Sequence, residues 1–283
     1  MFTDVSRYHW AFQAISRLFR RGIIGGYGDG TFRPDSPVSR AEVASMLDRQ
    51  HVGIAQAMED LAPSVIEIQA SGGPYANSRS SLGSGVVLDT DGHIATNMHV
   101  IWYGVEGGEI DVHLDSEPNT PYMAEWIAGD MVQDLAIIKV NIPPEKLRPV
   151  KLAERVIWGE EILCIGHPIY YRNTLTRGCI SYKHRLHTDG RTYHQTDASI
   201  NPGNSGGGAF NLCRELVGLP TWKMVWVDET MTAPVTNIGF LVPVEAVREM
   251  YQDRVLQGKA GLPAGQSIAA GVKMDIVLGG GQK

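Results

Sequence analysis

One serine of this chain lies in a loop whose composition suits nucleophilic chemistry. Ser205 is part of the run GNSGG at 203–207, directly after a polar, turn-rich segment at 195–202. A serine hydroxyl becomes a useful nucleophile only when a base removes its proton, and the oxyanion that it creates needs backbone N–H donors. Glycine adopts backbone angles closed to other residues, so the amides of Gly203 and Ser205 can point into one hollow. Such residues also form ordinary turns, so the loop needs a base and an acid elsewhere in the chain.

A histidine at the end of an expected hairpin can act as the base. Residues 84–88 and 93–100 have the pattern of two strands, and the Asp/Gly sequence 89–92 separates them. This pattern predicts a tight hairpin whose second strand ends at His99. Taken alone, a histidine there is usually a surface or hydrogen-bonded core residue, so its chemistry depends on its partners.

An aspartate further along the chain is the expected partner of His99. Asp134 directly precedes the apolar, β-branched run 135–140, which predicts a buried strand with a carboxylate at its mouth. Asp130 is the competing carboxylate, but no buried run follows it directly, and we assign it to a loop. Along the chain the order is base, acid, nucleophile, as in chymotrypsin-like enzymes and unlike subtilisins or α/β-hydrolases.

Three segments resemble the signatures of HtrA-type, trypsin-like serine proteases. They are TNMHV at 96–100, DLAIIKV at 134–140 and TDASINPGNSGG at 196–207. The resemblance extends from about Met58 to about Tyr251. It implies a mostly β protein with two six-stranded antiparallel β-barrels (chymotrypsin-like) and an active site in the cleft between them.

The resemblance also implies a role for each of these residues. Ser205 would attack the scissile carbonyl, His99 would accept and then donate the proton, and Asp134 would orient the imidazole and stabilise its cation. The backbone amides of Gly203 and Ser205 would form the oxyanion hole. This chemistry acts on polypeptide substrates and needs neither a metal nor an organic cofactor.

Specificity is expected to depend on residues before Ser205 and on the closing strand. Ser199 occupies the position that resembles the floor of the primary specificity pocket, where a preference for Arg or Lys would require a carboxylate. Ile238, Gly239 and Phe240 are the expected walls. A small neutral floor suggests aliphatic or medium-sized apolar side chains.

The chain departs from the family pattern around and after the nucleophile. Gly208 replaces a proline, which we expect to loosen the following strand. Pro220 and Trp222 replace small polar residues on the strand that pairs with substrate, and proline lacks the N–H that such pairing uses. After about Gly258 only a tail at 259–283 remains, and nothing in it resembles a PDZ domain.

The N-terminal region has a different pattern. We expect a helix from about Trp10 to Arg21, a Gly-rich loop, and a second helix from about Arg40 to Gln50 that opens with a capping box of Ser39 and Glu42. The motifs GGYGDGTFRP and SRAE in this region resemble an S-layer homology repeat. The resemblance implies a helix–loop–helix module that binds cell-wall polysaccharide non-covalently, commonly through several repeats.

Two polar residues of this repeat are the expected polymer contacts. They are Asp29 and Arg40, since a guanidinium can pair with anionic sugars. A single repeat is close to the lower size limit for a stable core. Whatever the unit binds, its core is expected to contain Trp10, Ile15, Leu18 and Phe32.

Composition sets the broad class of protein. With 283 residues, of which 43% are hydrophobic and 20% charged, the chain can bury a two-barrel core and a small extra domain. A net charge of −6 argues against a general nucleic-acid binder. We expect no membrane span, because no apolar stretch approaches the required length, and Met1 leads into the repeat without a secretory leader.

Cysteines and histidines offer two further sites to consider. Cys164, Cys179 and Cys213 match no metal or redox spacing, and buried free thiols are expected over a Cys164–Cys179 pair. His184, His187 and His194 crowd one polar stretch, where we expect a solvated loop and no metal, because no carboxylate cluster accompanies them.

These observations predict an S-layer homology repeat at 1–50, a protease domain at 51–258 and a tail at 259–283. The main hypothesis is a serine endopeptidase acting on unfolded or damaged proteins at the cell surface of a bacterium. The alternative is a wall-binding or structural protein on a catalytically inactive scaffold, and a holdase role is compatible with the main hypothesis. The oligomeric state stays open, with a trimer among the alternatives.

Overall fold

The computed structural model describes residues 2–72, 80–105, 107–168, 171–186, 190–223 and 237–258, except the side chains of residues 50–52 and 223. Backbone contacts divide the chain into two compact units, residues 1–60 with 212–214 and residues 61–211 with 215–283. Each unit is described by itself. The tail expected at 259–283 lies outside the described residues, and so does His187.

The N-terminal unit contains the helix–loop–helix. Helix α1 (Phe12–Arg20) precedes the Gly-rich loop, and helix α2 (Arg40–Leu61) follows it. The capping box is confirmed: the Ser39 N–H donates to Glu42 Oε2 (2.7 Å), and the Glu42 N–H donates to Ser39 Oγ (3.2 Å). The first of these bonds lowers the pKa of Glu42. The buried core of the unit is Phe2, Val5, Ile15, Ile23 and Ile24.

Two expectations for this unit are wrong. Trp10 precedes α1 and is 88% exposed, because Ile15, one turn into the helix, takes the buried position. Leu18 and Phe32 pack against the core as expected, although each is only partly buried. The second helix does not stop near residue 50 but continues to Leu61, since no proline interrupts it.

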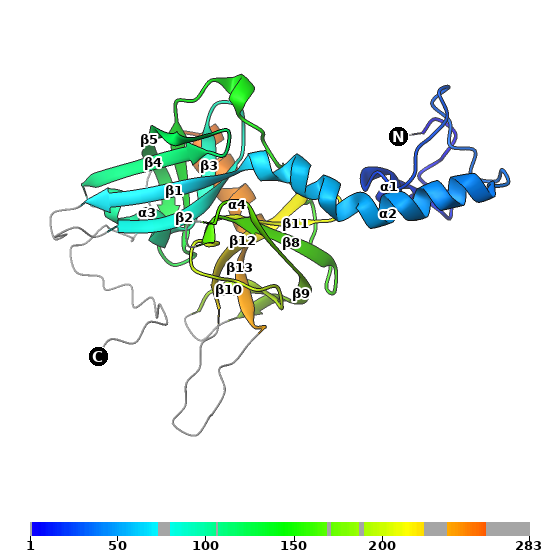
Figure 1. Cartoon of the computed structure of the whole chain (residues 1–283). Helices are drawn as coiled ribbons and strands as arrows, with labels where there is room; N and C mark the ends of the chain where they lie inside the picture. The colour runs from blue at the N-terminus through cyan, green and yellow to red at the C-terminus, as the bar shows by residue number, and fades with distance from the viewer. Residues whose placement is uncertain are drawn as a thin grey trace. The chain divides into compact units, whose positions relative to one another are not determined.

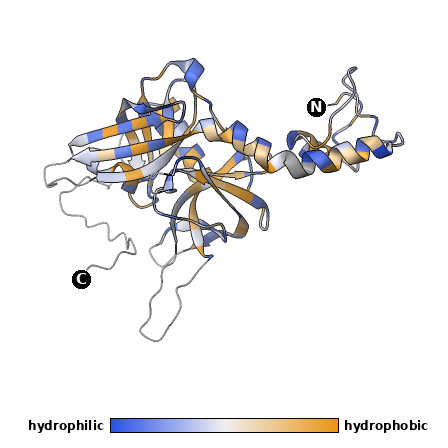
Figure 2. Cartoon of the chain, in the orientation of Figure 1, coloured by the Kyte–Doolittle hydropathy of each residue, from blue (hydrophilic) through white to orange (hydrophobic). Residues whose placement is uncertain are grey.

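The first barrel of the larger unit is closed in the order β1-β2-β3-β6-β5-β4 (Figure 1). On β4, Ile110, Val112 and Leu114 point inward and polar residues alternate with them, as the hydropathy colouring of the barrel strands illustrates (Figure 2). Its strands are β1 (Val65–Gly72), β2 (Ser80–Val87), β3 (His93–Thr96), β4 (Gly108–Leu114), β5 (Glu117–Asp130) and β6 (Leu135–Val140).

The second barrel is also six-stranded, because β11 pairs with both β8 and β12 and so closes the ring β11-β8-β9-β10-β13-β12. The two-residue strand β7 (Lys151–Leu152) adds a parallel pairing to β12. The expected two-barrel, mostly β fold is therefore confirmed. The ring consists of β8 (Glu161–Gly166), β9 (Thr174–Leu186), β10 (Thr192–Thr196), β11 (Gly208–Asn211), β12 (Glu215–Lys223) and β13 (Gly239–Pro243).

Short helical segments complete the unit. A 3₁₀ turn (Ala62–Ser64) leads into β1, and another (Pro144–Lys146) follows β6. Helix α4 (Val244–Met250) follows β13 and continues as a π-helical stretch (Tyr251–Leu256). None of the helices in the described part of the chain is long and apolar enough to span a membrane.

The hairpin before His99 forms as predicted, but its second strand is shorter. Val86 pairs with Ala95, and the Asp89 carboxylate accepts the backbone N–H groups of Asp91 and His93 in the turn. Strand β3 ends at Thr96, and His99 belongs to a helix, α3 (Met98–Val105). Between the strand and the helix, the buried Asn97 side chain donates to the Asp134 carbonyl (2.8 Å) and ties this turn to the start of β6.

The cysteines are free in this structure. On the adjacent strands β8 and β9, Cys164 lies opposite Thr176, and Cys179 lies opposite Glu161. This offset of three residues is too long for a disulfide. Cys164 is buried as expected, which raises the pKa of its thiol to about 12, whereas Cys179 is only partly buried.

Candidate active site

His99 and Asp134, the expected base and acid, meet at one end of the first barrel. Strands β3 and β6 pair with Thr96 opposite Ala136, so the residues just beyond this pair, on α3 and before β6, share one end of the sheet. His99 Nδ1 lies 2.7 Å from Asp134 Oδ2, and the His99 backbone N–H donates to Asp134 Oδ1 (3.0 Å). With the carboxylate ionised, Nδ1 carries the proton and donates it, so the Nε2 lone pair is available as a base.

Asp134 is held as an anion in a buried position. Burial by itself raises the pKa of this carboxyl, but electrostatic attraction to the His99 ring and hydrogen bonds from His99 and Thr221 lower it by a larger amount, so the net shift is downward. The backbone of Asp134 is left-handed (φ 55°), a conformation that aspartate tolerates better than most residues. The rival carboxylate, Asp130, ends β5 and accepts the N–H groups of the next turn.

Thr221 is a site residue that the sequence analysis missed. Its hydroxyl donates to Asp134 Oδ2 (2.6 Å), and its carbonyl accepts the hydroxyl of Ser205 (3.0 Å). It therefore connects the acid of the first barrel with the nucleophile loop of the second. Only its position two residues before the end of β12 marks it, since a strand threonine is otherwise unremarkable.

The Ser205 hydroxyl is hydrogen-bonded to a group other than His99. Its side chain is 9% exposed, and among the described residues its hydroxyl bonds to the Thr221 carbonyl and not to His99. The bond to His99 has to form by rotation of the serine side chain, which is common for catalytic groups without substrate.

The backbone before Ser205 forms a tight turn. Asn204 N–H donates to the Asn201 carbonyl (2.9 Å), and Gly203 between them has φ 97°. A positive φ at the third position is the mark of a type II turn, which explains the glycine. The amides of Asn204, Gly206 and Gly207 all donate to backbone carbonyls. In the described chain, the amides of Gly203 and Ser205 have no such acceptor.

Both parts of the chain are similar to known protein families. A trypsin-like peptidase domain matches residues 83–219, and an S-layer homology domain matches residues 2–44. Serine protease HTRA4 of Mus musculus is 35% identical over 77% of this chain and 45% of its own length. A serine protease HtrA-like protein of Staphylococcus haemolyticus is 30% identical over 73% of this chain and 33% of its own.

The solved structures agree. The crystal structure of the serine endoprotease from Yersinia pestis superposes with a TM-score of 0.58 at 29% identity, covering 79% of this chain and 69% of that one. The chain contains an S-layer homology repeat followed in the sequence by an HtrA-type, trypsin-like peptidase domain. It spans less than half the length of the two curated relatives.

The departures of this HtrA-type domain from the family pattern have local explanations. A Cβ at Gly208 would lie 2.2 Å from the ring of Phe210, which covers the position, so the strand is packed and not loosened as we expected. Pro220 sits at an irregularity of β12, beyond the last pairing with β11 at Gly218. The missing N–H of Pro220 therefore removes no hydrogen bond from the pairing of β12 with β11. The Pro220 carbonyl accepts the N–H of Gly206 (2.9 Å).

The expected pocket residues differ in exposure. Ser199 is exposed and Ile238 is partly exposed, so both are accessible to a substrate side chain. Gly239 is buried, and a Cβ there would lie 2.7 Å from Ile200. Phe240 is 2% exposed and stacks on Trp222, with ring centroids 4.2 Å apart. Phe240 therefore belongs to the core of the second barrel and is not an exposed wall of the expected pocket.

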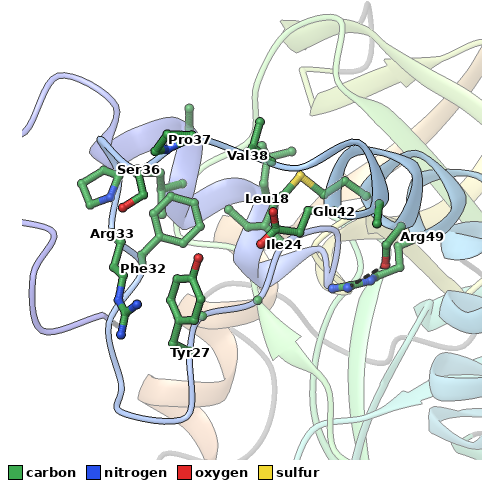
Figure 3. Close-up of a pocket in the computed structure, with 18 residues that line it drawn as sticks. Leu18, Ile24, Tyr27, Phe32, Arg33, Ser36, Pro37, Val38, Glu42 and Arg49 are labelled. Carbon is green, nitrogen blue, oxygen red and sulfur yellow. Dashed lines mark hydrogen bonds between the residues drawn. The ribbon is translucent and has the colours of Figure 1, made fainter.

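The S-layer homology unit contains a cavity of about 690 Å³ with an apolar floor. In Figure 3, Leu18 and Ile24 lie between Arg33 and Arg49. Asp29 and Arg40, the expected polymer contacts, do not line this cavity. The Asp29 carboxylate accepts hydrogen bonds from Thr31 and pairs with Arg33 (2.8 Å), contacts that lower its pKa to about 2. It thus stabilises the Gly-rich turn.

A cluster of His184, His194 and Glu245 lies on the second barrel, with candidate ligand atoms within 4.8 Å of one another. The sequence analysis missed its carboxylate, because Glu245 comes from α4, far along the chain. His194 Nδ1 accepts the His184 backbone N–H (3.3 Å), so neutral His194 carries its proton on Nε2, 3.4 Å from Glu245 Oε2. A histidine that binds a metal coordinates it through an unprotonated ring nitrogen and donates a hydrogen bond from the other nitrogen. His194 has its unprotonated nitrogen on the His184 amide and its N–H toward Glu245, so the arrangement fits a polar contact between His194 and Glu245 better than a metal site.

Proposed function

We propose that the HtrA-type domain is a serine endopeptidase that hydrolyses peptide bonds in unfolded or damaged polypeptides. The observation that carries the proposal is the pair of His99 Nδ1 and the buried Asp134 carboxylate at 2.7 Å, linked through Thr221 to Ser205. This arrangement leaves a neutral imidazole nitrogen for the hydroxyl proton. The similarity to named serine proteases supports the same activity.

The reaction divides into two proton-coupled steps. Ser205 Oγ leaves the Thr221 carbonyl, gives its proton to His99 Nε2 and bonds to the scissile carbonyl carbon. His99 then donates that proton to the leaving amine, and the C–N bond breaks to give an acyl-enzyme. A water molecule gives a proton to His99 and attacks the ester carbon. The bond between that carbon and Ser205 Oγ then breaks, His99 returns the proton to Oγ, and the acyl part leaves with a new carboxyl group. Asp134 stays ionised throughout and stabilises the imidazolium.

The amides of Gly203 and Ser205 are the proposed oxyanion donors. Each of the other three amides between 203 and 207 has a backbone acceptor, whereas these two have none among the described residues. Buried amides without a partner are rare in folded proteins, so a ligand oxygen is the natural acceptor. Losing one such donor typically costs about 3 kcal/mol of transition-state stabilisation.

Labelling and hydrolysis test this proposal together. The wild-type chain is expected to cleave casein and to react with a peptidyl phosphonate at Ser205, and Ser205→Ala is expected to lose both activities. Ser71→Ala is the matched control, because it removes an exposed serine at the end of β1 that belongs neither to the triad nor to the expected specificity pocket. A folded wild type with neither activity would favour the inactive scaffold, and cleavage that persists in Ser205→Ala would refute the assignment.

We also infer that the N-terminal unit attaches the protein to cell-wall polysaccharide, which would place it at a bacterial cell surface. The support is the cavity lined by Tyr27, Arg33 and Arg49. The Arg33 guanidinium already forms an ion pair with Asp29. Arg49 is exposed, and among the described side chains it bonds only to the Ser45 hydroxyl (2.9 Å). Arg49 can therefore pair with an anionic sugar.

Binding to purified wall polymer tests this second role. Arg49→Ala is expected to weaken binding of the full chain about tenfold, equivalent to about 1.4 kcal/mol. Arg17→Ala, which removes an exposed arginine of α1 outside the cavity, is expected to leave binding unchanged. Equal losses in both variants would indicate general charge attraction, and no binding by the wild type would refute the role.

A further inference from the structure

Ser84 is a fully buried serine on strand β2 of the first barrel, away from the triad in sequence. Strand β3 pairs with β2 only at Val86 and Val87. Beyond these backbone pairs, the Thr96 hydroxyl at the end of β3 donates to the Ser84 carbonyl (2.7 Å). The N–H and hydroxyl of Ser84 bind the nucleophile loop of the second barrel instead.

Two donors of Ser84 hold two carbonyls of that loop. The Ser84 backbone N–H donates to the Ser205 carbonyl (2.8 Å), and Ser84 Oγ donates to the Gly203 carbonyl (2.7 Å). Ser84 Oγ also accepts the backbone N–H of His167 (2.9 Å). Because that contact supplies a proton to the oxygen, the hydroxyl's own proton is directed to Gly203.

The peptide between Asn204 and Ser205 is thereby bracketed on both sides. The preceding peptide is fixed by the Ser84 hydroxyl at its carbonyl and by Asn201 at its N–H. The following peptide is fixed by the Ser84 amide at its carbonyl and by Pro220 at its N–H. The bracketed peptide accepts the Gly207 N–H at its carbonyl, and it carries the Ser205 N–H, which has no acceptor among the described residues.

The contact between β2 and the nucleophile loop is tightly packed, so no other group has room to replace the Ser84 hydroxyl as a donor. A Cβ at Gly206 would lie 2.2 Å from the Ser84 carbonyl, and a Cβ at Gly166 would lie 3.2 Å from Ser84 Oγ. Removing the hydroxyl thus leaves the Gly203 carbonyl and the His167 N–H unpaired in a packed site, which destabilises this arrangement of the loop.

We propose that Ser84 is a positioning residue that aligns the oxyanion donors by clamping the carbonyls of Gly203 and Ser205 from the opposite barrel. The proposal rests on the proposed serine endopeptidase function. The clamp fixes groups that bind charge only in the transition state, so its loss lowers kcat and leaves KM and the pH profile of His99 unchanged. The pair of His99 and Asp134 makes no described hydrogen bond with Ser84.

Kinetics on the full chain test the proposal. Ser84→Ala is expected to lower kcat with a peptide substrate about ten- to hundredfold, with KM unchanged, and to raise the inhibition constant of a peptidyl boronate by a similar factor. Ser81→Ala is the matched control. Ser81 lies on the same strand as Ser84, but its hydroxyl donates to the Val100 carbonyl of α3 (2.6 Å) and not to the nucleophile loop. Ser84→Cys, which keeps a weak donor, is expected to give an intermediate kcat.

Several outcomes would overturn the proposal. A wild-type kcat in Ser84→Ala, or in Ser84→Cys if the alanine variant does not fold, would show that the clamp does not position the donors. A rise in KM alone, or an equal loss in Ser81→Ala, would point to a general packing role. An inactive wild type would instead refute the protease function itself, so the two failures are distinguishable.

Discussion

Thr221→Val removes one hydroxyl from the buried site and keeps the shape of the strand. The hydroxyl donates to Asp134 Oδ2 at 2.6 Å, and it is one of three donors to that carboxylate. A hydrogen bond to a charged group contributes about 1.5–3 kcal/mol, and one pKa unit corresponds to about 1.4 kcal/mol. The substitution is therefore expected to lower the free energy of unfolding at pH 7 by about 1.5–3 kcal/mol and to raise the pKa of Asp134, because the carboxylate loses one of its donors.

The sign of the pH dependence follows from that shift. The pKa of Asp134 is lowered in the folded chain, so its contribution to stability is present above the unfolded value of 3.8 and is lost as pH falls through the lower folded value. The difference between wild type and Thr221→Val should thus be largest near neutral pH and shrink in acid. Since His99 is less firmly oriented by the altered carboxylate, kcat/KM is expected to fall about tenfold.

Urea denaturation at several pH values and peptide hydrolysis at pH 8 provide the measurements. Thr221→Ser, which retains the hydroxyl, is the matched control and should stay close to wild type in both assays. If Thr221→Val kept the wild-type stability and kcat/KM, the hydrogen bond to Asp134 would contribute nothing, and the account of the buried carboxylate would be wrong.

Three other predictions concern single contacts. Gly208→Pro, the residue typical of the family, is expected to destabilise the domain by about 1–3 kcal/mol because of Phe210, and Phe210→Ala should relieve part of that cost in a double-mutant cycle. Tyr251→Phe removes a 2.6 Å bond to Asp89, whose pKa is lowered, so a loss of about 1 kcal/mol near pH 7 should vanish as pH falls below 3.8 in denaturation curves. Cys164, with its pKa raised to about 12, should resist iodoacetamide at pH 8 until the chain unfolds, as mass spectrometry can show.

Local patterns were sufficient wherever a structure depends on neighbouring residues. The run 135–140 is a buried strand, the sequence 89–92 is a hairpin turn, and Ser39 with Glu42 forms a capping box. Each of these follows from a short-range rule of periodicity, turn chemistry or capping. The sequence also nominated the candidate base, acid and nucleophile, because their motifs carry the resemblance to the family.

The tertiary structure decided what depends on distant segments. Thr221 reaches Asp134 across 87 residues, and the Ser84 hydroxyl reaches Gly203 across 119, so no local pattern marks either contact. His99 lies in α3, and the Asn97 side chain before this helix bonds to the Asp134 carbonyl, which only the pairing of β3 with β6 brings near. The sequence by itself determined the kinds of strands, turns and reactive groups in this protein. Barrel closure decided which of those groups touch, because pairing between strands far apart in the sequence sets their register and brings their ends together.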